Sequence, residues 1–133
     1  MGFVHEKDNP KQLDLRQFYL RDDYVESISK AINQTTILSE LSLSQCGLND
    51  KRALTLLTSL NLPYIDLLDI SYKPLLTSIF YKKLNSAIEL QSSGIRKLSL
   101  EGNKIGDKIL GRLVKSLTIG NRIIELNVSK NEI

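Results

Sequence analysis

Several residue types are scarce in this chain of 133 residues, and each scarcity excludes a class of protein. Cys46 is the single cysteine, which excludes an intrachain disulfide and a cysteine-based metal site. His5 is the single histidine, and no spacing in the sequence supplies further ligands for a histidine metal site. A lone cysteine and a lone histidine in unrelated places do not form a nucleophilic pair. We therefore predict a protein that is not an enzyme and holds neither a metal nor a cofactor.

Aromatic residues, strong charge and long apolar runs are scarce as well. Aromatic residues make up 6% of the chain and tryptophan is absent, which argues against a stacking platform for single-stranded nucleic acid. The net charge is only +3, with acidic and basic residues interleaved, so we expect no nucleic-acid partner. No apolar run has the length of a membrane span, and residues 1–6 lack the blocks of a signal peptide. Together with the low cysteine content, this predicts a cytoplasmic protein.

What the sequence does contain is one spacing that returns five times. In the clearest copy, Ile95 to Ile105, apolar residues occupy the first, fourth, sixth and eleventh positions, and Asn103 occupies the ninth. The copies start near residues 10, 38, 65, 95 and 123, so successive starts lie 28, 27, 30 and 28 residues apart. A fixed period of this size indicates a solenoid, in which each unit covers its neighbour.

Each copy predicts a short strand followed by a helix. Apolar and polar residues alternate in Leu98-Ser99-Leu100, as is expected for a strand with one buried face and one solvent-exposed face. The same alternation occurs at residues 13–15, 41–43, 68–70 and 126–128. In the fourth copy, apolar residues then recur at helical spacing between Ile109 and Leu117, including Val114. Asp107 is the predicted N-cap of this helix, and Gly111 is predicted to allow close helix packing. Because the copies run in the same direction, the sheet should be parallel.

These residues resemble a known family. The pattern Leu-x-x-Leu-x-Leu-x-x-Asn-x-Ile, as in residues 95–105, resembles the signature of leucine-rich repeats. The long period with a full helix is similar to the ribonuclease-inhibitor subclass, and Leu41 to Leu48 resembles its cysteine-bearing variant. The resemblance covers residues 10–133 and follows a polar segment, residues 1–9. It implies an α/β fold: a short right-handed leucine-rich repeat solenoid of about five repeats, with an inner parallel sheet and outer helices.

The ninth position of each copy is expected to hold the solenoid together. In leucine-rich repeats the asparagine at this position bonds the backbone of its own turn and of the neighbouring turn, which implies that role for Asn103 and Asn131. Buried turn amides and carbonyls need such partners. Cys46 occupies the same position in the second copy, where we expect it to be buried and structural rather than reactive. Lys73, in the third copy, should turn outward.

The resemblance implies a non-catalytic module that binds a protein partner through the concave face of the sheet and the strand-exit loops. The alternative for this face is plain solvated surface in a longer horseshoe. The candidate partner-binding residues are Asp14, Arg16, Glu40, Ser42, Leu67, Asp69, Tyr72, Lys97, Ser99, Glu101, Glu125 and Asn127.

Basic residues gather on the predicted outer helices. They are Lys51, Arg52, Lys82, Lys83, Lys104, Lys108, Arg112 and Lys115. We expect them to solvate the backs of the helices. The alternative is a stripe that faces acidic partners or anionic lipid.

Two other functions stay open at this point. Some proteins with similar repeats activate small GTPases through a loop arginine, a role that Arg16 or Arg96 could fill. The sequence ends at Ile133, directly after the fifth strand signature, which predicts a fragment of a larger sensor or effector, or self-association through this strand. Because bacterial effectors delivered into host cells also carry such repeats, a host cytosol is the alternative location.

Overall fold

The structure, a computed structural model, describes residues 11–34, 38–72, 75–90, 93–120 and 122–133, without the side chain of Lys11. His5, Lys73 and the polar segment 1–9 lie outside these residues. The strands are β1 (Lys11–Asp14), β2 (Leu38–Ser42), β3 (Leu67–Asp69), β4 (Lys97–Ser99) and β5 (Glu125–Asn127). The helices are α1 (Asp22–Asn33), α2 (Asp50–Ser59), α3 (Ser78–Glu89) and α4 (Asp107–Gly120), with a short 3-10 turn, η1 (Leu62–Tyr64).

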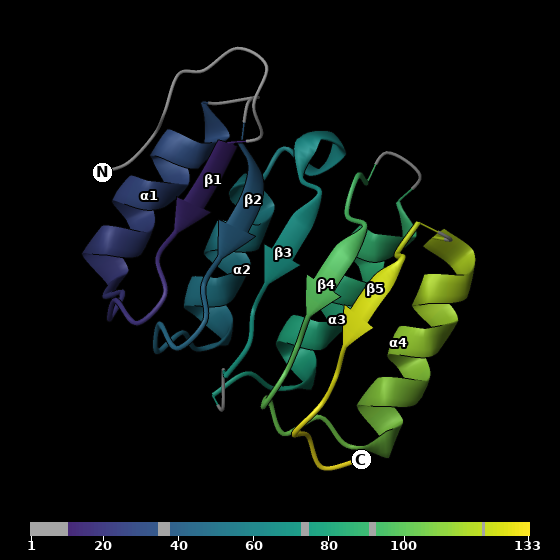
Figure 1. Cartoon of the computed structure of the whole chain (residues 1–133). Helices are drawn as coiled ribbons and strands as arrows, with labels where there is room; N and C mark the ends of the chain where they lie inside the picture. The colour runs from purple at the N-terminus through teal and green to yellow at the C-terminus, as the bar shows by residue number, and fades with distance from the viewer. Residues whose placement is uncertain (1–10, 35–37, 73–74, 91–92, 121) are drawn as a thin grey trace.

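The five strands form one parallel sheet in the order of the sequence, β1-β2-β3-β4-β5. Figure 1 shows the strands side by side in one layer, with the four helices in a second layer along one face of the sheet. The predicted solenoid with an inner parallel sheet and outer helices is therefore confirmed. None of the described helices is both long and apolar enough to cross a membrane.

Short polar side chains start the second and third helices. The Asn49 side chain caps α2 by accepting a hydrogen bond from the Arg52 amide, and Thr77 caps α3 by accepting one from the Ile79 amide. The prediction that Asp107 is an N-cap is wrong by one position, because α4 begins at Asp107 itself. In the first turn its carboxylate still lies near the positive end of the helix dipole.

The core is one continuous layer between the sheet and the helices. It runs from Leu13 in the first repeat to Leu113 in α4, and Leu41, Phe80 and Leu100 are completely buried. One predicted core residue departs from this arrangement. Val114 is 50% exposed, because α4 turns Leu113 and Ser116 inward instead.

A ladder of side chains ties the strand exits of adjacent repeats together, as predicted. The Asn103 amide donates to the Ile70 carbonyl at 2.7 Å, and the Asn131 amide donates to the Leu100 carbonyl at 2.9 Å. The Cys46 thiol, fully buried, donates to the Leu15 carbonyl at 2.7 Å. Each acceptor is the sixth residue of the preceding copy, so each ladder residue satisfies a backbone group that its own repeat does not contain.

The side chain of a ladder residue bonds both the preceding turn and its own turn. The Asn131 carbonyl oxygen accepts hydrogen bonds from the backbone amides of Asn103 and Ile105, both at 2.8 Å, while its amide bonds the carbonyl of Val128. The ninth position of the first copy differs: Phe18 has no polar atom in its side chain and is 62% exposed. Among the described residues, the ladder is therefore formed by the second, fourth and fifth copies.

Leu100→Ala should lower the free energy of unfolding by about 2–5 kcal/mol, because Leu100 is fully buried and its deletion leaves a cavity. Chemical denaturation of both proteins measures the difference. The matched control is Lys97→Ala on the same repeat, an exposed residue whose removal should change stability by less than about 0.5 kcal/mol. Equal losses from the two substitutions would contradict the assignment of the strand faces.

Gly111→Ala should raise stability by about 0.5–1 kcal/mol, because glycine is unfavourable inside a helix. The predicted close helix packing at Gly111 is wrong: the residue is exposed, and an added Cβ would meet nothing within 4 Å. Thermal or chemical denaturation provides the measurement. Gly102→Ala is a control that should lower stability. Gly102 has a φ of +69°, and its added Cβ would lie 2.6 Å from the Tyr72 ring. If both variants are destabilised, the α4 assignment at Gly111 fails.

Candidate functional site

The face of the sheet opposite the helices, here called the concave face, carries three rows of side chains. The strand register aligns the first row as Gln12, Glu40, Leu67, Lys97 and Glu125, and the second as Asp14, Ser42, Asp69, Ser99 and Asn127. The third row continues into the strand exits as Arg16, Ser44, Ser71, Glu101 and Ser129. The candidate residues predicted from the sequence therefore lie in adjacent rows, together with Tyr72 at the exit of β3.

The candidate residues differ in exposure. Asp14, Arg16, Lys97, Glu125 and Asn127 are exposed, and Glu40, Leu67, Asp69, Tyr72, Ser99 and Glu101 are half-buried. Ser42 needs a correction, because it is only 7% exposed and its hydroxyl donates to the Asp69 carboxylate at 3.2 Å. Its small side chain lies between larger neighbours and holds Asp69 in place, so it offers almost no surface of its own.

The second row also fixes the shape of the strand exits. The side-chain oxygens of Asp14, Asp69 and Asn127 each accept a hydrogen bond from the backbone amide two residues later, all at 3.0 Å. Short acceptor side chains form this local turn readily, because they replace a backbone carbonyl as the partner of the amide. These three residues therefore have a structural role besides any contact with a partner.

Charges on the concave face are largely paired with one another. The Arg16 guanidinium binds the Asp14 carboxylate through Nε–Oδ1 at 2.9 Å and Nη2–Oδ2 at 2.7 Å, and these bonds lower the pKa of Asp14. Lys97 Nζ lies 3.8 Å from the Glu125 carboxylate on the next strand. Arg96, at the entry to β4, lies 3.8 Å from Asp66. Both arginines considered for GTPase activation are thus engaged by carboxylates of this chain.

A shallow hollow of about 360 Å³ lies over the C-terminal half of the sheet. Its lining includes six of the candidate residues, Leu67, Asp69, Lys97, Ser99, Glu125 and Asn127. Leu67 supplies an apolar side chain beside the Lys97–Glu125 pair. The hollow therefore combines apolar lining from four leucines, Leu67, Leu68, Leu98 and Leu126, with charges of both signs.

One position in every strand-exit loop adopts a left-handed backbone conformation. It is the eighth residue of each copy, and these residues are Gln17, Gln45, Tyr72, Gly102 and Lys130, with φ between 56° and 69°. In the first four copies the amide of this residue donates to the third-row carbonyl of the next copy, as Tyr72 does to Glu101 at 2.7 Å. Residues other than glycine adopt this conformation only where the surrounding structure imposes it. The exits are therefore held in one conformation.

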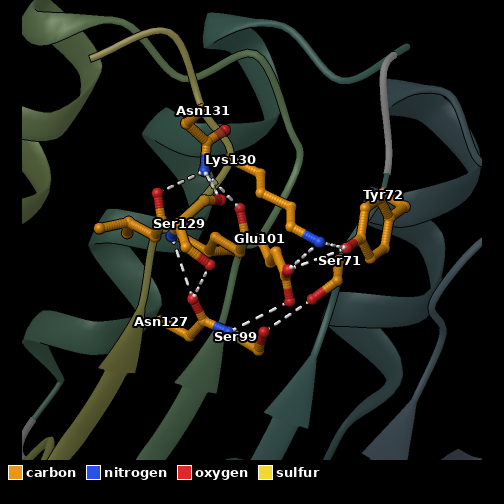
Figure 2. A network of polar contacts seen from close by, with 10 residues as sticks. Ser71, Tyr72, Ser99, Glu101, Asn127, Ser129, Lys130 and Asn131 are labelled. Atoms are coloured by element: carbon orange, nitrogen blue, oxygen red, sulfur yellow. Dashed lines mark hydrogen bonds and ion pairs between the residues drawn. The ribbon is translucent and has the colours of Figure 1, made fainter.

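The exits of β3, β4 and β5 meet in a polar network (Figure 2). The Tyr72 hydroxyl donates to Glu101 Oε2 at 2.8 Å, and Lys130 Nζ lies 3.4 Å from both the same carboxylate oxygen and the Tyr72 hydroxyl oxygen. The Asn127 amide donates to Glu101 Oε1 at 3.3 Å. The Tyr72 ring lies over Gly102, where any Cβ would collide with it. The ring and the two charges therefore have fixed positions at the edge of the concave face.

Lys130 was not among the residues predicted from the sequence, although a signal for it was present. Tyr72 and Lys130 both occupy the eighth position of their copies, so the repeat frame aligns them, as it does Gln17 and Gln45. The residues predicted from the sequence include the eighth position of the third copy, Tyr72, but not the equivalent position of the fifth copy, Lys130. Comparison of the eighth position in all five copies identifies both Tyr72 and Lys130.

Nowhere in the described ranges do three or more His, Cys, Asp or Glu side chains gather in a way that could hold a metal ion. The polar atoms of the network bond one another across three repeats instead. The chemistry that the site offers is recognition by hydrogen bonds, charge and one tyrosine ring.

Tyr72→Phe should raise the pKa of Glu101. Hydrogen bonding from the Tyr72 hydroxyl, helped by Lys130, holds this pKa below the ordinary value of a glutamate. Because the folded-state pKa is the lower one, the network stabilises the fold above the unfolded-state pKa, and this stabilisation is lost as the pH falls through the folded-state pKa. A carboxyl-carbon NMR titration measures the shift.

Asp14 is the internal control for that titration, because its pKa is lowered by Arg16 and not by Tyr72. Its titration should be the same in both proteins. An unchanged Glu101 titration in Tyr72→Phe would contradict the network.

Comparison with known proteins supports the fold. No protein-family model matches the sequence, and no curated protein sequence matches it. Among solved structures, the chain is similar to the tropomodulin C-terminal domain of Caenorhabditis elegans, with a TM-score of 0.73 and 13% sequence identity. The match covers 91% of this chain and 74% of that chain. The five parallel strands with outer helices are thus a leucine-rich repeat fold.

Proposed function

We propose that this protein is a non-catalytic interaction module that binds a protein partner through the concave face and the strand-exit loops. The observation that carries the proposal is the network at the exits of β3 to β5, where Tyr72, Glu101 and Lys130 are fixed in place at the edge of a shallow hollow. Ordered tyrosines and charges bind partners well, because little conformational entropy is lost when the complex forms.

The chemistry of the face indicates the kind of partner. The hollow over β3 to β5 is shallow, so it suits a protein surface better than a small molecule, which usually requires a deep apolar pocket. Most charges of the concave face are paired with one another, as in Lys97–Glu125 and Arg16–Asp14, so a partner must match the pattern of these pairs. The specificity of binding should therefore depend on the order of the charges.

We also infer that residues 10–133 form one domain of the ribonuclease-inhibitor-like subclass. Its helices of 12, 10, 12 and 14 residues per repeat support this subclass, because shorter repeats leave no room for a full helix. A cytoplasmic location, or a host cytosol, stays a prediction, as does self-association through β5. Activation of a small GTPase stays a prediction too, and the pairing of Arg16 with Asp14 gives it no support.

Exchange of the concave charges tests the proposal. The double substitution Lys97→Glu with Glu125→Lys keeps the net charge and leaves an acidic residue facing a basic one, but it reverses their order. We expect a captured partner to be lost or weakened by about tenfold or more, as is typical when a charged hot spot is altered. Quantitative affinity capture and calorimetry with the captured protein provide the measurements.

The matched control is an equivalent exchange on the outer side. Glu26 and Lys30 form an exposed pair at 3.4 Å on α1, and Glu26→Lys with Lys30→Glu reverses it without changing the net charge. Binding to this variant should equal that of the unmodified protein. A partner that binds both variants equally well would rule out the concave face as its site.

A further inference from the structure

A groove runs between α3 and α4 on the outer side of the solenoid, away from the concave face. It has a volume of about 700 Å³ and is lined mainly by apolar atoms. Figure 1 shows the two helices side by side over the C-terminal half of the sheet. The side chains that matter here are Ile79 and Lys82 from α3, and Asp107, Lys108, Ile109 and Arg112 from α4.

Helical spacing places these side chains in two stripes. Ile79 and Lys82 are three residues apart on α3, and Lys108 and Arg112 are four residues apart on α4, so each pair shares one face of its helix. Ile79 is 62% exposed, although it is a large β-branched side chain, and Ile109 is half-buried. The groove therefore has apolar walls with a basic rim on both sides.

The three cations of the rim have no ion-pair partner among the described residues. Ion pairs in those residues engage other cations, such as Arg16, Arg52, Lys97 and Lys130, but not Lys82, Lys108 or Arg112. One acidic residue, Asp107, lines the groove, which leaves its lining with an excess of positive charge. Unpaired charges of one sign around a hollow attract a ligand of the opposite sign.

We propose that this groove binds an acidic amphipathic segment of a protein partner. Apolar side chains of the segment contact Ile79 and Ile109, while its carboxylates meet Lys82, Lys108 and Arg112. An amphipathic helix laid into a groove between two helices is a recurring mode of peptide recognition. An anionic bilayer fits less well, because its surface is flat and cannot fill a hollow between two helices. This surface is separate from the concave face, so the two proposals stand or fall independently.

The test uses the full chain and a fluorescent synthetic peptide of about 15 residues, long enough for four helical turns, with leucines on one face and glutamates beside them. Fluorescence anisotropy should show saturable binding that weakens as salt is added. A peptide with glutamines in place of the glutamates should bind about tenfold more weakly or worse, because it lacks the charges that complement the rim.

Two triple variants of equal net charge locate the site. Lys82→Glu, Lys108→Glu and Arg112→Glu together should weaken binding of the acidic peptide by about tenfold or more, whereas Lys30→Glu, Lys51→Glu and Lys83→Glu should change it by less than about twofold. All six side chains are exposed or lie at the groove rim, so both variants should fold. Ile79→Ser tests the apolar wall without changing charge and should also weaken binding.

Three results would overturn the proposal. Equal losses in the two triple variants would mean that the peptide responds only to overall charge. Binding to vesicles of phosphatidylcholine and phosphatidylserine, with none to the peptide, would assign the basic rim to a membrane. Absence of peptide binding at low salt would show that the groove does not recognise this chemistry.

Discussion

The structure depends on the hydrogen bond that each ladder side chain makes to the preceding repeat. Cys46, Asn103 and Asn131 donate to the carbonyls of Leu15, Ile70 and Leu100, which lie at the strand exits, where the parallel ladder gives way to loops. A buried carbonyl without a partner would destabilise the fold, so each repeat needs its neighbour. The thiol is a weaker donor than an amide, yet it fits the same enclosed site. The buried leucines then fill the space between the sheet and the helices.

The same constraint explains why the strand exits are suited to binding. Ladder bonds brace the turns that contain Gly102 and Lys130, and every strand exit holds a left-handed residue, such as Tyr72, whose amide bonds the next repeat. The strain of a left-handed side chain, about 1 kcal/mol per residue, is offset by the regular bonding around it. Side chains from three repeats can then meet around Glu101, far apart in sequence but adjacent in space.

Much of this architecture follows from periodicity in the sequence, because the spacing of leucines assigns strand faces, and the strands pair with equivalent positions of the copies aligned although the copies start 27 to 30 residues apart. Residues at repeat positions, such as Leu100, Asn103 and Cys46, were therefore predictable. Val114 and Gly111 were not, since their environment depends on how far α4 rotates about its axis, which helical spacing alone does not determine. Ser42 was misjudged for a similar reason: alternation predicts its face but not the size of the side chains around it.

The two faces of the solenoid differ in how their charges are balanced, and this difference sets how each can recognise a partner. On the concave face Asp14 and Arg16 neutralise each other, as do Lys97 and Glu125, while Glu40 and Asp69 have no ion-pair partner among the described residues, so the face keeps a small excess of negative charge. On the outer face Lys82, Lys108 and Arg112 have no such partners among the described residues, so their field extends into solvent. Because the sheet and the helices form separate layers, occupation of one face does not block the other. The two proposed sites could therefore be occupied at the same time, the concave face by a partner selected through the order of charges and the groove between α3 and α4 by one attracted through excess positive charge.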